Sequence, residues 1–282
     1  MHDSMRDHGA TYLLLAPAGV IFGTLFVLPL TYFLVISFWR VVLFKLKPDF
    51  TFANYLQVFE LHLPTLLFTL GLALVIAMLT TSLGFVYAYL IRFKAGRWGP
   101  TLLFIALVTL FGGYLMKIYS WMTILGITGV LNSALRALGI IDEPLPWLFY
   151  NVGAVVVTLV NFLLPLAILP IYASMRGITD IEMEAARDLG AGGWRRFSDI
   201  VVPRSHPGIM AGFALCFLLA AGDYLTPQLV GGKVNMIGVQ IAPQFGGLGN
   251  WPMGSAMSFI TLGSSLAVIL LLIFLLAQWR PR

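Results

Sequence analysis

The stretch from Glu184 to Pro203, EAARDLGAGGWRRFSDIVVP, carries a cluster of charges in a chain that is otherwise unusually apolar. Of the 282 residues, 59% are hydrophobic and only 10% are charged, and the mean hydropathy is +0.91. Soluble domains are about 45–50% apolar and about 25% charged, so a soluble fold of this length has no means of burying so much apolar surface. The composition therefore predicts an integral membrane protein, in which the quoted stretch lies outside the bilayer.

Apolar runs long enough to cross a bilayer recur along the sequence. A membrane-spanning helix needs about 20 mostly apolar residues, and six runs meet this length. Because backbone polar groups cannot face lipid, we expect each run to be helical and the fold to be all-α. We interpret residues 1–282 as one transmembrane domain with predicted spans at 12–38, 64–91, 101–126, 149–174, 207–230 and 254–278.

The basic residues between the spans predict the orientation. Six spans put both termini on one side, and Lys and Arg are normally enriched in short cytoplasmic loops. The side of the termini carries Arg6, Arg92, Lys94, Arg97, Arg176, Arg187, Arg195, Arg196, Arg204, Arg280 and Arg282. The other side carries Arg40, Lys45, Lys47, Arg136 and Lys233. We therefore expect a multi-pass protein of the bacterial inner membrane with both termini in the cytoplasm, and with residues 179–203 as a cytoplasmic loop between the fourth and fifth spans.

The quoted stretch and the residues before it have the signals of a short helix with defined ends. Thr179 and Glu182 have the Ser/Thr-x-x-Glu spacing of a capping box. Gly190 is well placed to end the helix in a left-handed conformation. Three apolar residues that fall four apart share one helix face: Ile181, Ala185 and Leu189. A helix of about ten residues is marginal in water by itself, so the pattern favours docking against a partner.

The same stretch resembles the cytoplasmic EAA motif of the ABC-importer permeases. That motif consists of Glu-Ala-Ala, three residues, Gly, nine residues and Ile-x-Leu-Pro. Here Glu184-Ala185-Ala186 is followed, at the same spacings, by Gly190 and then by Ile200-x-Val202-Pro203, in which Val202 replaces the usual Leu. Two further stretches, at 119–132 and 222–232, are similar to the spermidine/putrescine-type permeases, and the resemblance covers nearly the whole chain.

The resemblance implies a type I importer fold and a place in a larger assembly. The chain is then a permease subunit, not an enzyme, with a second permease, two ATP-binding subunits and an extracytoplasmic binding protein as partners. No cofactor is expected in this chain, because it has no Gly-x4-Gly-Lys-Ser/Thr phosphate loop; ATP and Mg²⁺ belong to the ATP-binding subunits. The implied contact with those subunits is a coupling helix that includes Glu184, Ala185, Ala186, Arg187, Asp188 and Gly190.

Two charged residues inside predicted spans are candidates for the solute path, because charges at membrane depth are costly and usually functional. Lys117 lies past the middle of the third span, and Asp223 lies in the outer part of the fifth. Either Lys117 snorkels outward or pairs with Asp223 as a structural contact, or both residues line the path. The nearest aromatic residues, whose faces attract cations, are Tyr119, Trp121 and Tyr224.

The solute implied by the resemblance is spermidine, putrescine or a related amine, which Asp223 would attract. Lys117 keeps a second solute class open, namely small zwitterions or anions. Two other classes of membrane protein fit less well. A membrane-embedded enzyme needs clustered polar catalysts, and an ion-driven secondary transporter needs internal repeats and several buried carboxylates; the sequence has neither. Nucleic acid is not expected as a partner, and segment 231–252 either contacts the binding protein or is a plain connector.

Overall fold

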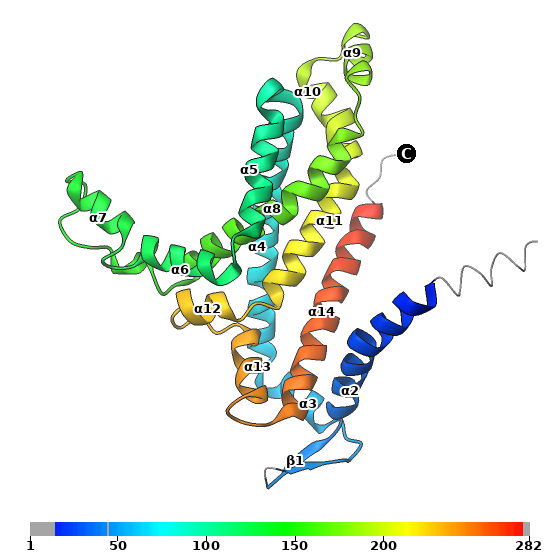
Figure 1. Cartoon of the computed structure of the whole chain (residues 1–282), viewed down its shortest axis with the longest axis vertical. Helices are drawn as coiled ribbons and strands as arrows, with labels where there is room; N and C mark the ends of the chain where they lie inside the picture. Colours follow the sequence, from blue (N-terminus) through cyan, green and yellow to red (C-terminus); the bar gives the residue numbers. More distant parts are fainter. Residues whose placement is uncertain (1–14, 44, 279–282) are drawn as a thin grey trace, which may run out of the picture. The chain divides into compact units, whose positions relative to one another are not determined.

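The computed structural model describes residues 15–43 and 45–278 (Figure 1). Residues 12–14 of the first predicted span, together with Arg6, Arg280 and Arg282, lie outside this part of the chain. The chain divides into two compact units. Unit one consists of the described residues up to Leu63 together with Ile241–Ile260, and unit two consists of Pro64–Gln240 together with the described residues from Thr261 onward.

Unit one contains the first apolar helix and a small hairpin. Its elements in chain order are η1 (Gly23–Val27), α2 (Leu28–Ile36), β1 (Arg40–Val42), β2 (Lys45–Lys47), α3 (Ala53–Leu61) and the first turns of α14 (Trp251–Gln278). Strands β1 and β2 pair antiparallel, with Val41 opposite Leu46. This hairpin is the exception to the all-α prediction, because strands of three residues leave no recognisable pattern in the hydropathy.

Unit two contains the remaining helices and the larger core. In chain order they are α4 (Leu63–Tyr89), η2 (Leu90–Lys94), η3 (Gly96–Trp98), α5 (Gly99–Phe111), α6 (Tyr114–Leu125), α7 (Val130–Ala137), η4 (Pro146–Leu148), α8 (Val152–Arg176), α9 (Asp180–Asp188), α10 (Gly193–Arg196), η5 (Phe197–Val201), α11 (Val202–Ala221), α12 (Leu225–Val230) and α13 (Ile237–Phe245). Helix α13 starts in unit two and ends in unit one, and α14 starts in unit one and ends in unit two.

Six helical segments of the described chain are long and apolar enough to cross a membrane. They are Leu15–Ile36, Leu63–Lys94, Tyr114–Ala137, Val152–Arg176, Gly193–Ala221 and Trp251–Leu275. A shorter apolar helix covers Gly96–Phe111. The number of spans therefore agrees with the sequence-based prediction. The boundaries differ by a few residues in most spans and by more in the third and fifth.

The predicted third span, 101–126, is divided in the structure. Helix α5 ends at Phe111 and α6 begins at Tyr114, because Gly112 and Gly113 both have extended backbone conformations, with ψ of 119° and 140°. Glycine is about 1 kcal/mol less favourable than alanine inside a helix, so a pair of glycines is a natural point for the break. Hydropathy does not detect it, because the residues on both sides are apolar.

The predicted fifth span, 207–230, is divided as well. Helix α11 ends at Ala221, and α12 begins at Leu225. Asp223 lies in the short link between them and is therefore not part of a continuous helix. A helix end leaves backbone groups without intrahelical partners, and a nearby carboxylate can accept hydrogen bonds from them.

Helices α4, α8 and α11 form the core of unit two. Ile76 on α4, Leu163 on α8 and Phe217 on α11 are fully buried in one apolar cluster. Helices α8 and α11 approach each other closely at Gly208 of α11, where an added Cβ would lie 2.3 Å from the carbonyl oxygen of Pro170. Glycine therefore allows α11 to pack with its backbone directly against α8.

Candidate functional sites

Helix α9 has a complete cap at its N-terminus. The Thr179 hydroxyl accepts a hydrogen bond from the Glu182 N–H at 3.2 Å, and the Glu182 carboxylate accepts one from the Thr179 N–H at 2.9 Å. This arrangement confirms the capping box predicted from the sequence. The bond from the Thr179 backbone N–H, with a smaller contribution from Arg204, holds the pKa of the Glu182 carboxyl below its usual range.

The C-terminal end of α9 is equally well defined. Gly190 has a φ of +82°, the left-handed conformation expected from the sequence. The Gly190 N–H donates to the Arg187 carbonyl and the Ala191 N–H to the Ala186 carbonyl, both at 2.9 Å. These two bonds form a Schellman motif, in which the last helical carbonyls are satisfied. Helix α9 is therefore a defined unit with both ends closed.

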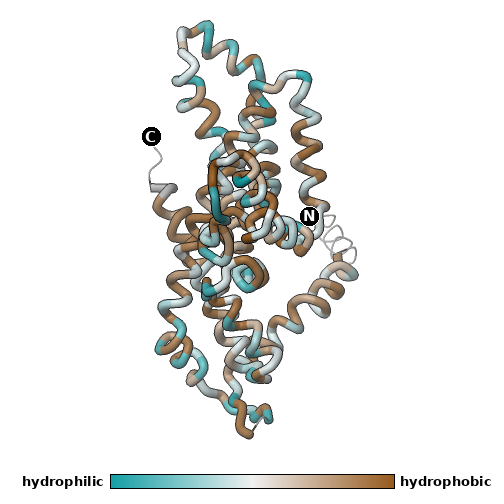
Figure 2. The backbone as a smooth tube through the Cα atoms, turned by 90° about the vertical axis from the view of Figure 1, so that its left-hand side faces the viewer, coloured by the Kyte–Doolittle hydropathy of each residue, from teal (hydrophilic) through white to brown (hydrophobic). Residues whose placement is uncertain are grey.

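The apolar stripe of α9 faces away from the described chain. Ile181 is 77% exposed and Leu189 is 89% exposed, and Ala185 between them is exposed too. On the opposite side Met183 packs against the core of unit two. At the α9 end of unit two, the tube in Figure 2 has teal and white stretches between short brown ones, so polar residues surround these apolar positions in the sequence. Large exposed apolar side chains favour a protein contact in this position.

Most of the proposed coupling residues share this exposure. Glu184, Arg187 and Asp188 are exposed, and Ala186 is half-buried. The residues of the predicted coupling helix thus come together on one short element. None of these residues is buried in the core, so packing within this chain does not account for their presence on the helix.

Two arginines from distant parts of the sequence hold the start of α9. The Arg92 guanidinium donates to the Ile178 carbonyl at 2.7 Å and to the Asp180 carboxylate at 2.8 Å. Arg204 donates to the Gly177 carbonyl at 3.3 Å and to the Glu182 carboxylate at 3.2 Å. In the sequence both arginines are recognisable only as orientation signals, because no local pattern links them to α9.

The second site is a polar cluster around Asp223. The Tyr114 hydroxyl donates to the Asp223 carboxylate and lies 2.7 Å from the Thr226 hydroxyl. The backbone N–H of Thr226 also donates to Asp223, at 3.3 Å. The ring of Tyr114 lies against that of Phe162, with centroids 4.4 Å apart. Sequence reasoning missed Tyr114 and Phe162, since a single aromatic residue in an apolar span carries no signal.

Lys117 is close to this cluster but does not pair with Asp223. Its ammonium lies 5.3 Å from the centroid of the Phe162 ring, a cation–π distance. The hydrogen bonds of Asp223 are to Tyr114 and Thr226. Among the described residues there is thus no ion pair between Lys117 and Asp223, and the Phe162 ring contacts both Lys117 and Tyr114.

The other aromatic candidates have different surroundings. Tyr119 is 53% exposed on α6, whereas Trp121 on the same helix packs against a buried cluster with Ile118. Tyr224 follows Asp223 directly and packs beside Gly238, where an added Cβ would lie 3.0 Å from the Tyr224 Cβ. Among these three aromatic residues, Tyr224 thus lies closest in sequence to the carboxylate, and Tyr119 offers the most exposed ring.

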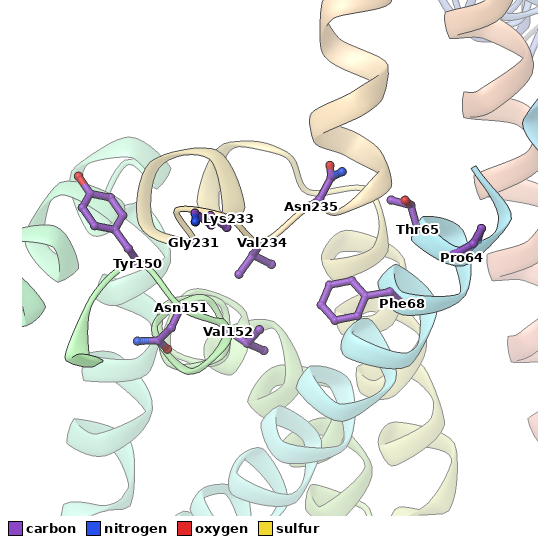
Figure 3. A pocket seen from close by; sticks show the side chains of 10 residues that line it. All are labelled: Pro64, Thr65, Phe68, Tyr150, Asn151, Val152, Gly231, Lys233, Val234 and Asn235. Atoms are coloured by element: carbon purple, nitrogen blue, oxygen red, sulfur yellow. The ribbon is translucent and has the colours of Figure 1, made fainter. Parts of the chain in front are cut away.

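A pocket of about 520 Å³ lies beside the first turns of α4 and the start of α8, whereas α9 follows the far end of α8. Figure 3 shows the residues that line it. Tyr150 and Asn151 directly precede α8, Phe68 comes from the first turns of α4, and Lys233 from the loop after α12. Tyr150 has a φ of +53°, and an added Cβ on Gly232 would lie 2.7 Å from the Tyr150 Cβ. A strained residue held against an obligatory glycine is typical of a functional surface.

Comparison with curated proteins identifies membrane permeases as relatives. The chain is 36% identical over 236 residues to the spermidine/putrescine transport system permease protein PotB of Escherichia coli (strain K12), with 83% of each sequence covered. PotB of Haemophilus influenzae is 34% identical over 210 residues, which cover 74% of this chain and 73% of that protein. The inner membrane ABC transporter permease protein YdcU of Escherichia coli is 30% identical over 230 residues, covering 77% and 73%.

Solved structures give the same fold. A chain of a bacterial ABC transporter involved in the import of the acidic polysaccharide alginate matches with a TM-score of 0.73 and 14% identity, covering 99% of both chains. The alginate transporter in complex with an alginate pentasaccharide-bound periplasmic protein gives a TM-score of 0.72 at 15% identity, covering 95% of this chain and 94% of that one. At such identities the likeness concerns the fold alone. No protein-family model matches the chain.

Proposed function

We propose a specific role for this chain, which belongs to the permease family of the ABC importers: it forms half of the translocation path for a polyamine or a related amine. The chain is a transport subunit and not an enzyme, like its relatives. A second permease supplies the other half of the path. Two ATP-binding subunits bind ATP and Mg²⁺, and an extracytoplasmic binding protein delivers the solute.

The observation that carries the coupling part of the proposal is the construction of α9. It is closed by a capping box and a Schellman motif, and it exposes Ile181 and Leu189. Glu184 lies in the same helix, where its carboxylate can accept charge-assisted hydrogen bonds from a partner. The small side chains of Ala185 and Ala186 permit close approach of another backbone. We therefore assign α9 as the coupling helix that an ATP-binding subunit displaces.

Gly190→Pro tests this assignment. Proline fixes φ near −65° and cannot adopt the +82° that closes α9. We expect the variant to reach the membrane and to lose ATP-driven transport. The measurement compares solute uptake into vesicles that contain the variant with uptake into vesicles that contain the same amount of the unmodified chain. Normal uptake by the variant would sink the coupling-helix assignment.

The orientation follows from the distribution of positive charge. The α9 end of unit two carries Arg92, Lys94, Arg97, Arg176, Arg187, Arg195, Arg196 and Arg204. The positive-inside tendency assigns this end to the cytoplasm, where the ATP-binding subunits lie. We extend the same orientation to the two termini of the chain, in the bacterial inner membrane.

The Asp223 cluster is the proposed solute contact. Polyamines are cationic at neutral pH, and Asp223 offers a carboxylate beside the aromatic faces of Tyr114 and Phe162. The names of the PotB relatives favour spermidine or putrescine as the solute. Lys117, with Tyr119, Trp121 and Tyr224, completes the proposed lining. The Lys117 ammonium lies over the Phe162 ring, so this lining also carries a positive charge.

The pocket with Lys233 is the proposed contact for the binding protein. It lies beside the start of α8, and α9 follows the far end of that span, so the pocket is extracytoplasmic in this orientation. A periplasmic protein is part of one solved transporter complex with the same fold. Transport then proceeds by alternating access. ATP-driven displacement of α9 opens the path outward toward the binding protein, and hydrolysis returns it to the inward-open state.

A further inference from the structure

We propose that Arg92 and Arg204 are positioning residues that join the base of α9 to α4 and α11, so that a displacement of α9 moves both spans together. The inference rests on the proposed function, in which an ATP-binding subunit moves α9. It adds the route by which that movement reaches the membrane helices.

The two arginines hold adjacent points of one short segment. Arg92 in η2 binds the carbonyl of Ile178 and the carboxylate of Asp180, at 2.7 and 2.8 Å. Arg204 near the start of α11 binds Gly177 and Glu182, at 3.3 and 3.2 Å. Four of the six residues from 177 to 182 therefore accept a hydrogen bond from an arginine on one of two spanning segments.

The capping box ties these contacts into one network. One oxygen of the Glu182 carboxylate accepts from the Thr179 N–H, and the other accepts from Arg204. The same side chain thus closes the helix and attaches it to α11. Because a carboxylate accepts several hydrogen bonds, it can serve both purposes at once.

The contacts that attach α9 lie in its first half, where the two arginines bind residues 177–182 and Met183 packs against the core. Ile178 at its base is fully buried, whereas Leu189 at its far end is 89% exposed. An added Cβ at Gly190 would find no atom within 4 Å. Figure 1 shows α9 at the extremity of unit two, beyond α10. Helix α9 therefore has the form of a lever, with a fixed base and an accessible tip.

The two spans that carry Arg92 and Arg204 also contact each other at the end near α9. Each has a π-helical turn there, η2 and η5. The Phe197 ring of η5 lies 5.6 Å from the ring of Tyr89 and 5.9 Å from that of Phe85. Single π turns inside α-helices occur frequently at functional sites. With the arginines in place, α9, α4 and α11 form one block at this end.

The guanidinium of Arg92 is the better shielded of the two. Its side chain is 20% exposed, and it lies 5.0 Å from the Phe93 ring centroid, whereas the side chain of Arg204 is 54% exposed. Exposed ion pairs contribute little to stability, but bonds to backbone carbonyls fix position. We therefore expect Arg92 to be the more important of the two.

The experiment uses the complete importer, with both permeases, the ATP-binding subunits and the binding protein, in proteoliposomes. The variants are Arg92→Gln, Arg204→Gln and the double variant, and the readout is solute transported per ATP hydrolysed. We expect the double variant to lose about tenfold in this ratio, within the usual range of coupling between sites. Subunit composition and ATP hydrolysis should stay near those of the unmodified importer.

Two controls separate coupling from folding and from general loss of charge. Arg92→Lys keeps a cation that can reach the same carbonyl and carboxylate, so it should retain most of the ratio. Arg97→Gln removes a cation from the same end, where Arg97 lies over the ring of Trp98, and should leave the ratio unchanged. A double variant with a normal ratio overturns the inference. Normal transport by Gly190→Pro would instead overturn the coupling-helix proposal itself.

Discussion

At the scale of single residues, Asp223 illustrates what a sequence can and cannot reveal. Its charge inside a predicted span is enough to make it a candidate for the solute path. Its hydrogen-bond partner Tyr114 is 109 positions away, and nothing in the sequence distinguishes that tyrosine from other aromatics. The fold brings the two together because α6 begins directly after the Gly112–Gly113 break and α11 ends just before Asp223.

Asp223→Asn is predicted to slow uptake of spermidine and putrescine. Asparagine keeps the size of the side chain and can still bond to Tyr114 and Thr226, but it has no charge for an ammonium group. Losing a hydrogen bond to a charged group costs about 1.5–3 kcal/mol, which corresponds to roughly a tenfold or greater loss in rate. The measurement is uptake of labelled polyamine at saturating binding protein.

The matched control is Asp199→Asn, since Asp199 is exposed and accepts a hydrogen bond from its neighbour Ser198. It should transport at the normal rate. If Asp223→Asn transports both polyamines as fast as Asp199→Asn, the Asp223 cluster is not a solute contact.

At the scale of the element, α9 was predictable because its signals are local. The capping box, the apolar stripe and Gly190 all lie within twelve residues, 179–190, and each appears in the structure. The attachment of α9 was not predictable, because Arg92 lies 86 positions from Ile178. Breaks in the spans were missed for another reason: hydropathy averages over a window, and two glycines do not lower it enough.

The cap of α9 is predicted to weaken in acid. The folded-state pKa of Glu182 lies below its ordinary value of 4.5, so the ionised carboxylate stabilises the helix fully above pH 4.5. This contribution is lost as the pH falls through the folded-state pKa. Hydrogen exchange of the α9 backbone amides, corrected for the intrinsic pH dependence, should show declining protection below pH 4.5.

Glu182→Gln provides the comparison, because glutamine still fits a capping box but does not titrate. In this variant, the protection of the α9 amides should not change with pH across this range. An equal acid-induced loss in the variant and the unmodified chain would mean that Glu182 is not the titrating group.

The contact between α8 and α11 gives a prediction about stability. In Gly208→Ala, the new methyl group would meet the Pro170 carbonyl oxygen at 2.3 Å, so one helix has to move. Overpacking of this kind costs about 1–3 kcal/mol. Thermal unfolding in detergent should show a lower midpoint for this variant.

Gly263→Ala is the control for that measurement. An added Cβ at Gly263 has no atom within 4 Å, and alanine favours the helix, so its midpoint should be equal to or above that of the unmodified chain. Midpoints that do not differ between the two variants would contradict the close packing at Gly208.

At the scale of the whole molecule, composition and the count of apolar runs were sufficient for the class. The six-span membrane fold is confirmed by the structure and by ABC-importer chains of the same fold, and the assignment to the permeases is confirmed by the PotB relatives. What composition does not contain is the assembly. In the proposed assembly, the exposed Ile181 and Leu189 side chains on α9 face a partner subunit.

The most direct test of the central claim is to purify the tagged chain gently from native membranes and to identify its partners by mass spectrometry. Unmodified chain is compared with Glu184→Lys and with Asp142→Lys, a control at an exposed carboxylate outside the 179–203 loop. We predict that an ATP-binding subunit and a second permease accompany the unmodified chain and the control. With Glu184→Lys, the second permease should remain and the ATP-binding subunit should be depleted. Recovery of the chain without these partners, or with an ATP-binding subunit that Glu184→Lys retains in full, would contradict the account.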